Sequence, residues 1–417
     1  MAILKPFSAF RPVPHLVSRV AALPYDVMDR QEAKEMVKNN PYSFLHVDKA
    51  EIDLEDSVHP YDEQVYQEAK KNLDQMIEQG VYKQDNTASL YLYRLTMNGR
   101  SQVGIVGCVP IDAYLNNEIK KHELTRADKE QDRIRHVDIC NAHTGPIFLT
   151  YSHQVSIDKI VAKHIYEQNP IYDFISEDEV RHEVWHISCQ EEIQKIQKEF
   201  LKVPVLYIAD GHHRAASAVQ VGLTRREKKL DYTGKEEFNF FLGVLFPHNQ
   251  LKILDYNRVV KDLNGLTEEG FLSAIQSSFT LQPWECEEPY QPQTPHTFGM
   301  YLGKQWYVLK TREELINDCD PVDQLDVSIL QKYLLHPILG IQDPRTDERI
   351  DFIGGVRGLK EIERRVKQDM KVGFSLYPTT IEELMEIADA DQIMPPKSTW
   401  FEPKLRSGIF LHLLEEE

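Results

Sequence analysis

Five consecutive residues near the middle of the chain, Asp210-Gly211-His212-His213-Arg214, combine the groups that bind and transfer phosphate. A guanidinium such as that of Arg214 presents a fork of donors that matches phosphate oxygens. The two imidazoles can donate hydrogen bonds or relay protons. The Asp210 carboxylate can hold a divalent cation that bridges phosphate oxygens. We therefore expect Asp210 and His213 to act in catalysis, Asp210 to ligate a metal, and Gly211, His212 and Arg214 to bind phosphate.

The flanking residues predict a strand, a tight turn and a helix around this motif. Residues 203–208 are almost continuously apolar, as in a buried strand, and the alanine-rich stretch 214–221 predicts a helix that ends at Gly222. Backbone N–H groups at a helix start favour an anion, and Gly211 lets a ligand approach closely. The alternative is that Asp210 caps the helix while the histidines pack or face solvent. So many polar residues directly after an apolar strand favour the phosphate site.

A charged segment upstream, residues 119–136, supplies further candidates for phosphate binding. Thr125 is expected to be the N-cap of a helix, with Asp128 three residues later as the capping acid. That helix would present Thr125, Lys129 and Arg133 on one face, where they could clamp a phosphate. A solvated helix with ion pairs such as Lys129–Asp132 explains the same charges, and both interpretations remain open.

The overall charge and the cysteines limit the class of protein. The chain has 417 residues with 48 Lys+Arg and 66 Asp+Glu, a net charge of −18, which disfavours binding to nucleic acid or anionic membranes. Five scattered cysteines without a C-x-x-C pair argue against a disulfide framework and a structural zinc site. The first residues lack a signal-peptide pattern, and no stretch reaches transmembrane length. We expect a cytoplasmic protein.

Strands alternate with helices along the chain, which predicts a mixed α/β (α+β) fold. We expect three regions: an N-terminal α/β region, a phosphate-binding core and a C-terminal α+β region, at residues 1–115, 116–250 and 251–417. The clearest local signals predict helices at 30–39 and 65–79 and a hairpin at 90–109 around Met97-Asn98-Gly99. They also predict a helix at 349–367 that two glycines interrupt, a capping box at 380–383 and a last strand at 408–414.

Well-known nucleotide and hydrolase motifs are missing from the sequence. It contains no G-x-x-x-x-G-K-[ST] loop, G-x-G-x-x-G fingerprint, H-E-x-x-H helix or G-x-S-x-G elbow. The common nucleotide-binding folds and hydrolases are therefore disfavoured.

The motif at residues 209–218 resembles the signature of the superfamily that joins ParB proteins, sulfiredoxin and free-serine kinases. The whole chain resembles a bacterial and archaeal family catalogued as a domain of unknown function. The matching segments are Phe10-Arg11-Pro12, Pro24-Tyr25-Asp26-Val27, Asn40-Pro41 with Ser43-Phe44, His122-Glu123 with Thr125, the Asp210–Arg214 turn, and Met394-Pro395-Pro396-Lys397-Ser398-Thr399.

This resemblance implies a ParB/sulfiredoxin-like core and a magnesium-dependent kinase. Members are similar to pyrophosphate-dependent serine kinases, so we expect phosphorylation of free L-serine, with pyrophosphate or a nucleotide as donor. The serine kinases use a glutamate as base upstream of their Asp-Gly turn, which makes Glu123 the candidate here. Asp26 is the alternative base, or an ordinary turn aspartate.

A Pro-rich loop near the C-terminus has two interpretations, packing, which its prolines and aromatic residues favour slightly, and closure over the site. In the second interpretation Lys397 would contact phosphate, and Ser398 or Thr399 the amino-acid end of the substrate. Two other functions stay open, a ParB-like nucleotide-binding switch with DNA or protein partners and a phosphatase or nucleotide hydrolase. Assembly as a homodimer also stays open.

Overall fold

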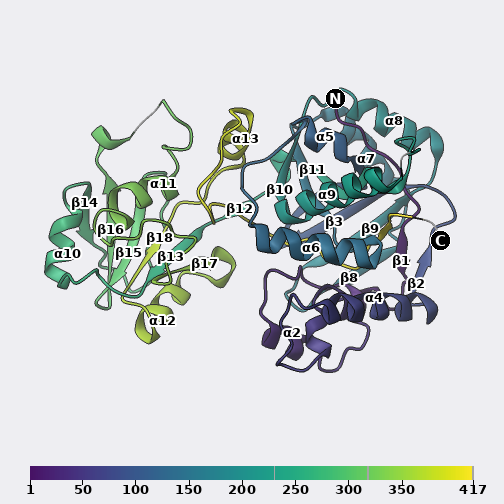
Figure 1. Ribbon diagram of the computed structural model, residues 1–417. Coiled ribbons are helices and arrows are strands. Elements are labelled where there is room, and N and C mark those ends of the chain that lie inside the picture. The colour runs from purple at the N-terminus through teal and green to yellow at the C-terminus, as the bar shows by residue number, and fades with distance from the viewer. Residues whose placement is uncertain (230, 317–318, 416–417) are drawn as a thin grey trace. The chain divides into compact units, whose positions relative to one another are not determined.

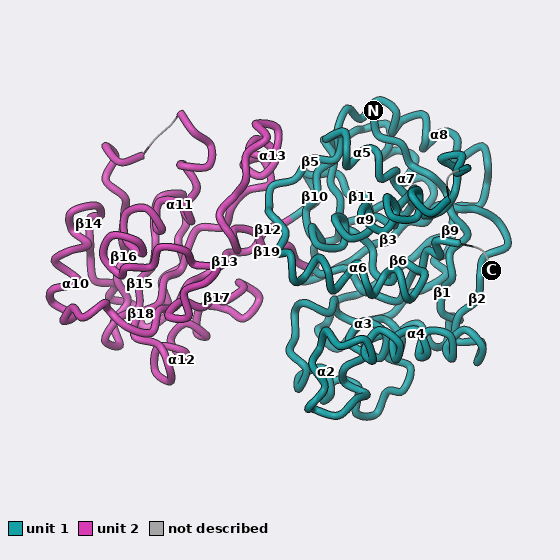
Figure 2. The backbone as a smooth tube through the Cα atoms, viewed as in Figure 1, with its two compact units in different colours: residues 1–251, 403–417 teal, residues 252–402 magenta. Residues whose placement is uncertain are grey.

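The computed structural model describes residues 1–229, 231–316 and 319–415 and divides the chain into two compact units (Figure 2). Unit 1 comprises residues 1–251 and 403–417, and unit 2 comprises residues 252–402. The chain therefore leaves unit 1 once and returns to it for its last residues. Each unit has a sheet of its own.

Unit 1 is built on a mixed sheet of eight strands (Figure 1). Most neighbours are antiparallel, but two pairs, β5 with β10 and β7 with β11, are parallel. In sheet order the strands are β5 (Ile119–Lys120), β10 (Leu206–Asp210), β7 (Ile147–Tyr151), β11 (Phe240–Pro247), β4 (Arg100–Pro110), β3 (Leu90–Met97), β9 (Arg181–Ile187) and β8 (Tyr172–Ile175).

The hairpin predicted around Met97-Asn98-Gly99 is confirmed as β3 and β4. Asn98 and Gly99 have φ values of 52° and 75°, as a two-residue turn between twisted strands requires. Two short antiparallel pairs complete the strands of this unit: β1 (Phe10–Pro12) with β2 (Tyr82–Gln84), and β6 (Ala142–His143) with β20 (His412–Leu413). The last strand is thus shorter than the stretch 408–414 predicted from sequence.

The helices of unit 1 pack on the sheet and on one another (Figure 1). They are α1 (Val17–Val20), α2 (Arg30–Val37), α3 (Leu45–Asp48), α4 (Glu63–Glu78), α5 (Ile111–Leu115), α6 (Ala127–Cys140), α7 (Val155–Glu167), α8 (Gln190–Phe200) and α9 (His212–Lys228), with 3-10 turns η1 (Ala50–Asp53), η2 (Glu237–Asn239) and η3 (His248–Gln250). The helices predicted at 30–39 and 65–79 are confirmed as α2 and α4.

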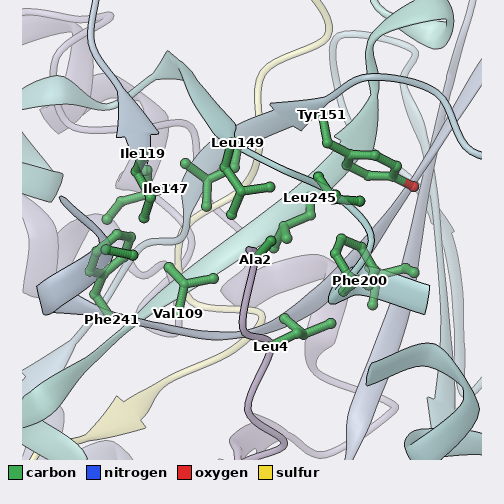
Figure 3. Packing of buried hydrophobic residues seen from close by; sticks show 14 of the residues in the cluster. Ala2, Leu4, Val109, Ile119, Ile147, Leu149, Tyr151, Phe200, Phe241 and Leu245 are labelled. Carbon is green, nitrogen blue, oxygen red and sulfur yellow. The ribbon is translucent and has the colours of Figure 1, made fainter. Parts of the chain in front are cut away.

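The main core of unit 1 lies between one face of the sheet and the helices α7, α8 and α9. Leu149 and Leu245 from the strands and Phe200 from α8 are fully buried in one apolar cluster (Figure 3). Ala215 and Ala218 from α9 join this cluster, since their small side chains let the helix approach the sheet closely. This packing holds the start of α9 at the end of β10.

A second apolar cluster joins α4 to the N-terminal segments. Val65, Ala69, Leu73 and Met76 recur at helical spacing on α4 and are buried against Phe44 and its neighbours. Helix α4 also packs on α6, which in turn packs on α9. The charged helix α6 is therefore fixed from two sides.

Helix α9 corrects the prediction that Gly222 ends the helix, because the helix continues to Lys228. A Cβ atom on Gly222 would lie 2.5 Å from the carbonyl oxygen of Phe238 and 2.7 Å from Cδ1 of Ile111. The glycine is therefore required by close packing rather than by helix termination.

Unit 2 contains an antiparallel sheet of six strands, with α12 packed on its central strands and α10 on the edge strand β14. In sheet order the strands are β14 (Phe279–Pro283), β16 (Gln305–Thr311), β15 (Thr297–Leu302), β18 (Val372–Ser375), β13 (Tyr256–Val260) and β17 (Ile350–Gly354), and a separate pair is formed by β12 (Ile253–Leu254) and β19 (Trp400–Phe401). The helices are α10 (Glu268–Ile275), α11 (Asp326–Leu330), a π-helical turn (Gln331–Leu335), α12 (Lys360–Gln368) and α13 (Ile381–Asp389), with 3-10 turns η4 (Glu313–Leu315) and η6 (Gly355–Arg357).

Two local predictions in unit 2 have opposite outcomes. The capping box is confirmed, because Thr380 and Glu383 exchange hydrogen bonds at the start of α13. The interrupted helix at 349–367 is wrong in its first part, where residues 350–354 pair with β13 as strand β17. Backbone pairing with a distant strand decides the conformation there, and the helix begins only at Lys360.

Together the two units give a mixed α/β structure, as the sequence predicts. Among the described residues, every helix is too short or too polar to cross a lipid bilayer.

Candidate functional site

The predicted turn forms the junction between strand β10 and helix α9. Gly211 is the N-cap of the helix with φ of 94°, in the left-handed region that glycine enters without strain. No side chain among the described residues caps this helix start. The carboxylate of Asp210 instead accepts the N–H of Gly211 at 2.9 Å. The first N–H groups of a 17-residue helix are thus left for water or a bound anion.

The Asp210 carboxylate forms an ion pair with a residue that sequence reasoning missed. Nζ of Lys404 lies 2.9 Å from Oδ2 of Asp210. Burial alone would raise the pKa of Asp210, but Lys404 outweighs it and lowers the pKa to about 2. Asp210 is therefore an anion at neutral pH. No motif in the sequence marks Lys404, which comes directly after Pro403, the last residue of the Pro-rich loop.

Arg214 lies in a partly buried group of aromatic and charged residues. Its Nη1 donates to the carbonyl oxygen of Pro146 at 3.0 Å, and its Nη2 lies 3.7 Å from Oδ1 of Asp26. The guanidinium carbons of Arg214 and Arg133 lie 5.7 Å and 4.1 Å from the ring centroid of Tyr25. Burial and the nearby Asp26 raise the pKa of Tyr25, so its hydroxyl stays protonated.

The two arginines line one small cavity of about 20 Å³. Its other polar walls come from Tyr25, Asp48, Thr144 and buried histidines, while Ile147 and Leu242 close the apolar side. The space accommodates about one water molecule. Arg133 of α6 and Arg214 of α9, both predicted from sequence to bind phosphate, thus lie on the same cavity.

His212 at the start of α9 faces the loop that follows β5. Its Nδ1 lies 3.9 Å from Oε2 of Glu123, and its ring meets that of His122 edge-on with centroids 4.4 Å apart. Burial lowers the pKa of His212 well below its usual value, and it lowers the pKa of His122 to about 4. Both imidazoles are neutral at physiological pH. The candidate base Glu123, whose side chain is 40% exposed, therefore lies beside the turn.

His213 connects the turn to the start of α6. Its Nε2 accepts the backbone N–H of Arg126 at 3.0 Å. Burial lowers the pKa of His213, and the charge of Lys129 lowers it further, while the charge of Asp26 acts to raise it. The alternative base Asp26, with a side chain 50% exposed, thus lies near both His213 and Arg214. Both candidate bases, Glu123 and Asp26, therefore lie close to the turn at Asp210–Arg214.

The start of α6 differs from the prediction. The helix begins at Ala127 with Arg126 as N-cap, so Thr125 lies outside it. The hydroxyl of Thr125 donates to Oε2 of Glu130 at 2.6 Å, which removes it from the expected capping position. The prediction that Thr125 lies on one helix face with Lys129 and Arg133 is therefore wrong.

Lys129 and Arg133 both lie on α6 but contact different neighbours. Nζ of Lys129 lies 5.3 Å from the ring centroid of Tyr61. Arg133 is buried and donates to Oδ2 of Asp132 at 2.8 Å. Asp132 also accepts the hydroxyl of Tyr66, so this aspartate belongs to a buried network rather than to a solvated surface pair.

The three C-terminal candidates belong to unit 2, where their contacts are local. Lys397 has φ of 59°, and its Nζ lies 5.6 Å from the ring centroid of Tyr256. Ser398 is buried, and its hydroxyl donates to the carbonyl oxygen of Pro395 at 2.6 Å. Thr399 follows in the same loop. That these residues contact phosphate and substrate stays a prediction.

A family model described as "Protein of unknown function (DUF1015)" matches residues 4–328, which is most of the chain. The chain belongs to this family. The matched range contains the turn, both candidate bases and helix α6. The family membership expected from the motifs is confirmed, and the family description itself assigns no activity. No curated protein matches the chain.

The solved structures that match this chain include three proteins of low sequence identity and low TM-score. A conserved hypothetical protein from Pyrococcus furiosus has 15% identity and a TM-score of 0.35, with 74% of this chain and 95% of that chain covered. A free serine kinase in complex with AMP has 16% identity, a TM-score of 0.35 and coverage of 73% and 91%. SbnI with C-terminal truncation from Staphylococcus aureus has 12% identity, a TM-score of 0.39 and coverage of 74% and 87%.

Proposed function

We propose that this protein is a phosphotransferase that phosphorylates free L-serine to O-phosphoserine, with pyrophosphate or a nucleotide as donor. The observation that carries the proposal is the start of α9. Its first N–H groups have no side-chain cap among the described residues, its first turn carries Arg214, and Oε2 of Glu123 lies 3.9 Å from Nδ1 of His212. An anion site next to an accessible carboxylate is the minimum that transfer of a phosphoryl group to a hydroxyl requires.

The reaction would use the residues around the turn as follows. The terminal phosphate of the donor binds the N–H groups at the start of α9 and the guanidinium of Arg214. Glu123 accepts the proton of the serine hydroxyl while the serine oxygen attacks the terminal phosphorus. The bond from phosphorus to the bridging oxygen breaks, and phosphate leaves from a pyrophosphate donor, or the shortened nucleotide from a nucleotide donor. Arg214, Arg133 and Lys129 offset the charge that develops on the transferred group.

Magnesium is the cofactor implied by the motif resemblance, and Asp210 is its proposed ligand. Mg²⁺ would supply positive charge to the donor phosphates. One oxygen of Asp210 accepts Lys404 and the other accepts the N–H of Gly211, so an ion at this carboxylate would compete with Lys404. His213, which contacts the loop before α6, is proposed to relay protons at the same turn.

The identities of acceptor and donor rest on the motif resemblance to pyrophosphate-dependent serine kinases. The same resemblance supports a ParB/sulfiredoxin-like core in residues 116–250. Within this proposal Lys397 contacts phosphate, and Ser398 or Thr399 contacts the amino-acid end of serine. The reaction would take place in the cytoplasm.

The proposal is tested with purified protein, L-serine, Mg²⁺ and either pyrophosphate, ADP or ATP. Formation of O-phosphoserine is followed by ³¹P NMR. We expect O-phosphoserine with at least one donor and none without serine. If no donor yields O-phosphoserine, the serine-kinase assignment fails. Release of phosphate at the same rate without any acceptor would instead identify a phosphatase or nucleotide hydrolase.

Single substitutions then distinguish the two candidate bases. Glu123→Gln should lower kcat by about 10²–10⁴-fold, the usual contribution of a general base. Asp26→Asn should lower it much less, since Asp26 faces Arg214. Asp173→Asn is the matched control, because Asp173 is an exposed carboxylate bonded to Arg181 on the surface of the same unit. The reverse order of effects would make Asp26 the base.

A further inference from the structure

Several buried histidines of unit 1 have a ring nitrogen without a well-aligned hydrogen-bond partner among the described residues, and two of them lie side by side at the start of α9. They are His122, whose ring also lies near the backbone of Ile208, and His212, with Nε2. Their exposed fractions are only 2% and 4%. What distinguishes this pair is that the two rings meet, with centroids 4.4 Å apart, so that their nitrogens can share one ligand.

A carboxylate completes this pair. One ligand atom each from His122, Glu123 and His212 lie within 4.8 Å of one another. Around an ion with bonds of about 2.0–2.2 Å, ligand atoms lie about 3–4 Å apart. Oε2 of Glu123 already lies 3.9 Å from Nδ1 of His212, which is within this range.

The surrounding backbone holds the two imidazoles in place without a metal. His122 follows β5, which pairs in parallel with β10, and His212 follows the turn at the end of β10. Adjacent parallel strands bring the residues after their carboxyl ends to the same edge of the sheet. The cluster is therefore a product of the sheet topology and needs no movement of the core.

The ligand types at the cluster suit a metal. The carboxylate of Glu123 supplies a negative charge within 4.8 Å of the imidazole nitrogens, and Asp210 ends strand β10 two residues before His212.

We propose that His122, Glu123 and His212 bind a first-row transition-metal ion such as Mn²⁺, Co²⁺ or Zn²⁺ at the start of α9. Two imidazole nitrogens and one carboxylate oxygen favour these ions over Mg²⁺ and Ca²⁺, which take oxygen ligands. Three protein ligands leave positions in the coordination sphere for water or for oxygens of a bound phosphate.

This site is distinct from a magnesium site at Asp210 and goes beyond the proposed kinase reaction. A carboxylate has two oxygens, so ligation through one oxygen of Glu123 leaves the other to accept a proton. The ion lies beside the helix start where the donor phosphate is proposed to bind, and it adds positive charge there.

The test measures metal binding directly, without serine or donor. The purified full-length protein is stripped with EDTA and dialysed against Mn²⁺, Co²⁺ or Zn²⁺, and bound metal per chain is determined by plasma emission spectrometry. We expect about one ion per chain. The visible absorption of bound Co²⁺ should show a low-symmetry site with nitrogen ligands.

Three variants assign the ion to its ligands. His122→Gln, His212→Gln and Glu123→Gln should each weaken binding at least tenfold and change the Co²⁺ spectrum. His164→Gln is the matched control, because His164 is a buried histidine that contacts a single carboxylate, Glu192, in the same unit. Circular dichroism checks the fold, and Glu123→Gln in its loop stays informative if a histidine variant does not fold.

The inference is overturned if no ion binds at about one per chain, or if Glu123→Gln leaves both the affinity and the Co²⁺ spectrum unchanged. These outcomes do not depend on the reaction. A protein that binds the ion but forms no O-phosphoserine contradicts only the proposed function.

Discussion

Lys404 and Asp210 lie 194 residues apart in the sequence, yet Nζ of one lies 2.9 Å from Oδ2 of the other. The lysine belongs to the segment that returns to unit 1 after unit 2, and the aspartate ends strand β10. The ion pair therefore connects the last part of the chain to the turn where an anion is expected. It also neutralises the one carboxylate of the motif, which would otherwise repel phosphate.

We predict that Lys404→Met weakens the binding of pyrophosphate by about tenfold, because it exposes the anion to an uncompensated carboxylate. Isothermal titration calorimetry measures the change. Lys404→Arg keeps the positive charge and should lose much less affinity. Equal affinity in the methionine variant and the wild-type protein would exclude an electrostatic role for Lys404.

Gly211→Ala should destabilise unit 1 by about 1–2 kcal/mol and weaken pyrophosphate binding. The φ of 94° is unfavourable for alanine, whereas its Cβ would meet nothing closer than 3.8 Å. The effect is therefore conformational and not steric. Gly80→Ala is the control, since Gly80 also has a positive φ, 73°, and open space around it. Urea unfolding should show a similar loss for both variants, with affinity reduced only in Gly211→Ala.

Gly222→Ala should lower the free energy of unfolding by about 1–2 kcal/mol, although alanine favours helices. The added Cβ would lie 2.5 Å from a backbone oxygen of Phe238, which cannot move aside as a side chain would. Gln220→Ala, at an exposed position of the same helix, should change stability by less than about 0.5 kcal/mol. A stabilised Gly222→Ala variant would contradict the close packing of α9.

Asp326 in unit 2 predicts a pH dependence of stability. Burial raises the pKa of this carboxyl to about 7, and its Oδ1 accepts the N–H of His296 at 2.7 Å. The folded chain thus holds a proton that the unfolded chain releases near pH 4, so the free energy of unfolding falls as pH rises from about 4 to about 7, by about 2–4 kcal/mol.

Asp326→Asn removes this titration and should flatten the pH dependence over the same range. Urea unfolding followed by tryptophan fluorescence is suitable, since Trp284, Trp306 and Trp400 all belong to unit 2. A variant whose stability falls with pH as steeply as that of the wild-type chain would show that another group titrates.

Several elements could be predicted because their signals are local. The hairpin turn at Asn98-Gly99, the apolar spacing of α4 and the capping box at Thr380 each lie within a few residues. Backbone dihedral preferences and side-chain periodicity act over the same distance, so the sequence alone indicates them.

Predictions failed where a distant contact outweighed a local preference. Gly222 suggested a helix end, but α9 continues because the glycine gives room to Phe238 and Ile111. Residues 350–354 suggested a helix, but pairing with β13 makes them a strand. Neither partner could be identified from the residues next to these positions.

The sequence by itself determined the local structure at the turn. An apolar strand, the glycine of the motif from Asp210 to Arg214 and an alanine-rich stretch specify a strand, a turn and a helix start, because their order along the chain is enough. Only the tertiary structure decided which groups surround that turn. Lys404 beside Asp210, Arg133 with Arg214 on Tyr25, and His122 with Glu123 beside His212 are brought together by strand pairing and helix packing. Contacts between residues so far apart in the chain depend on the whole fold, which is why no local pattern predicts them.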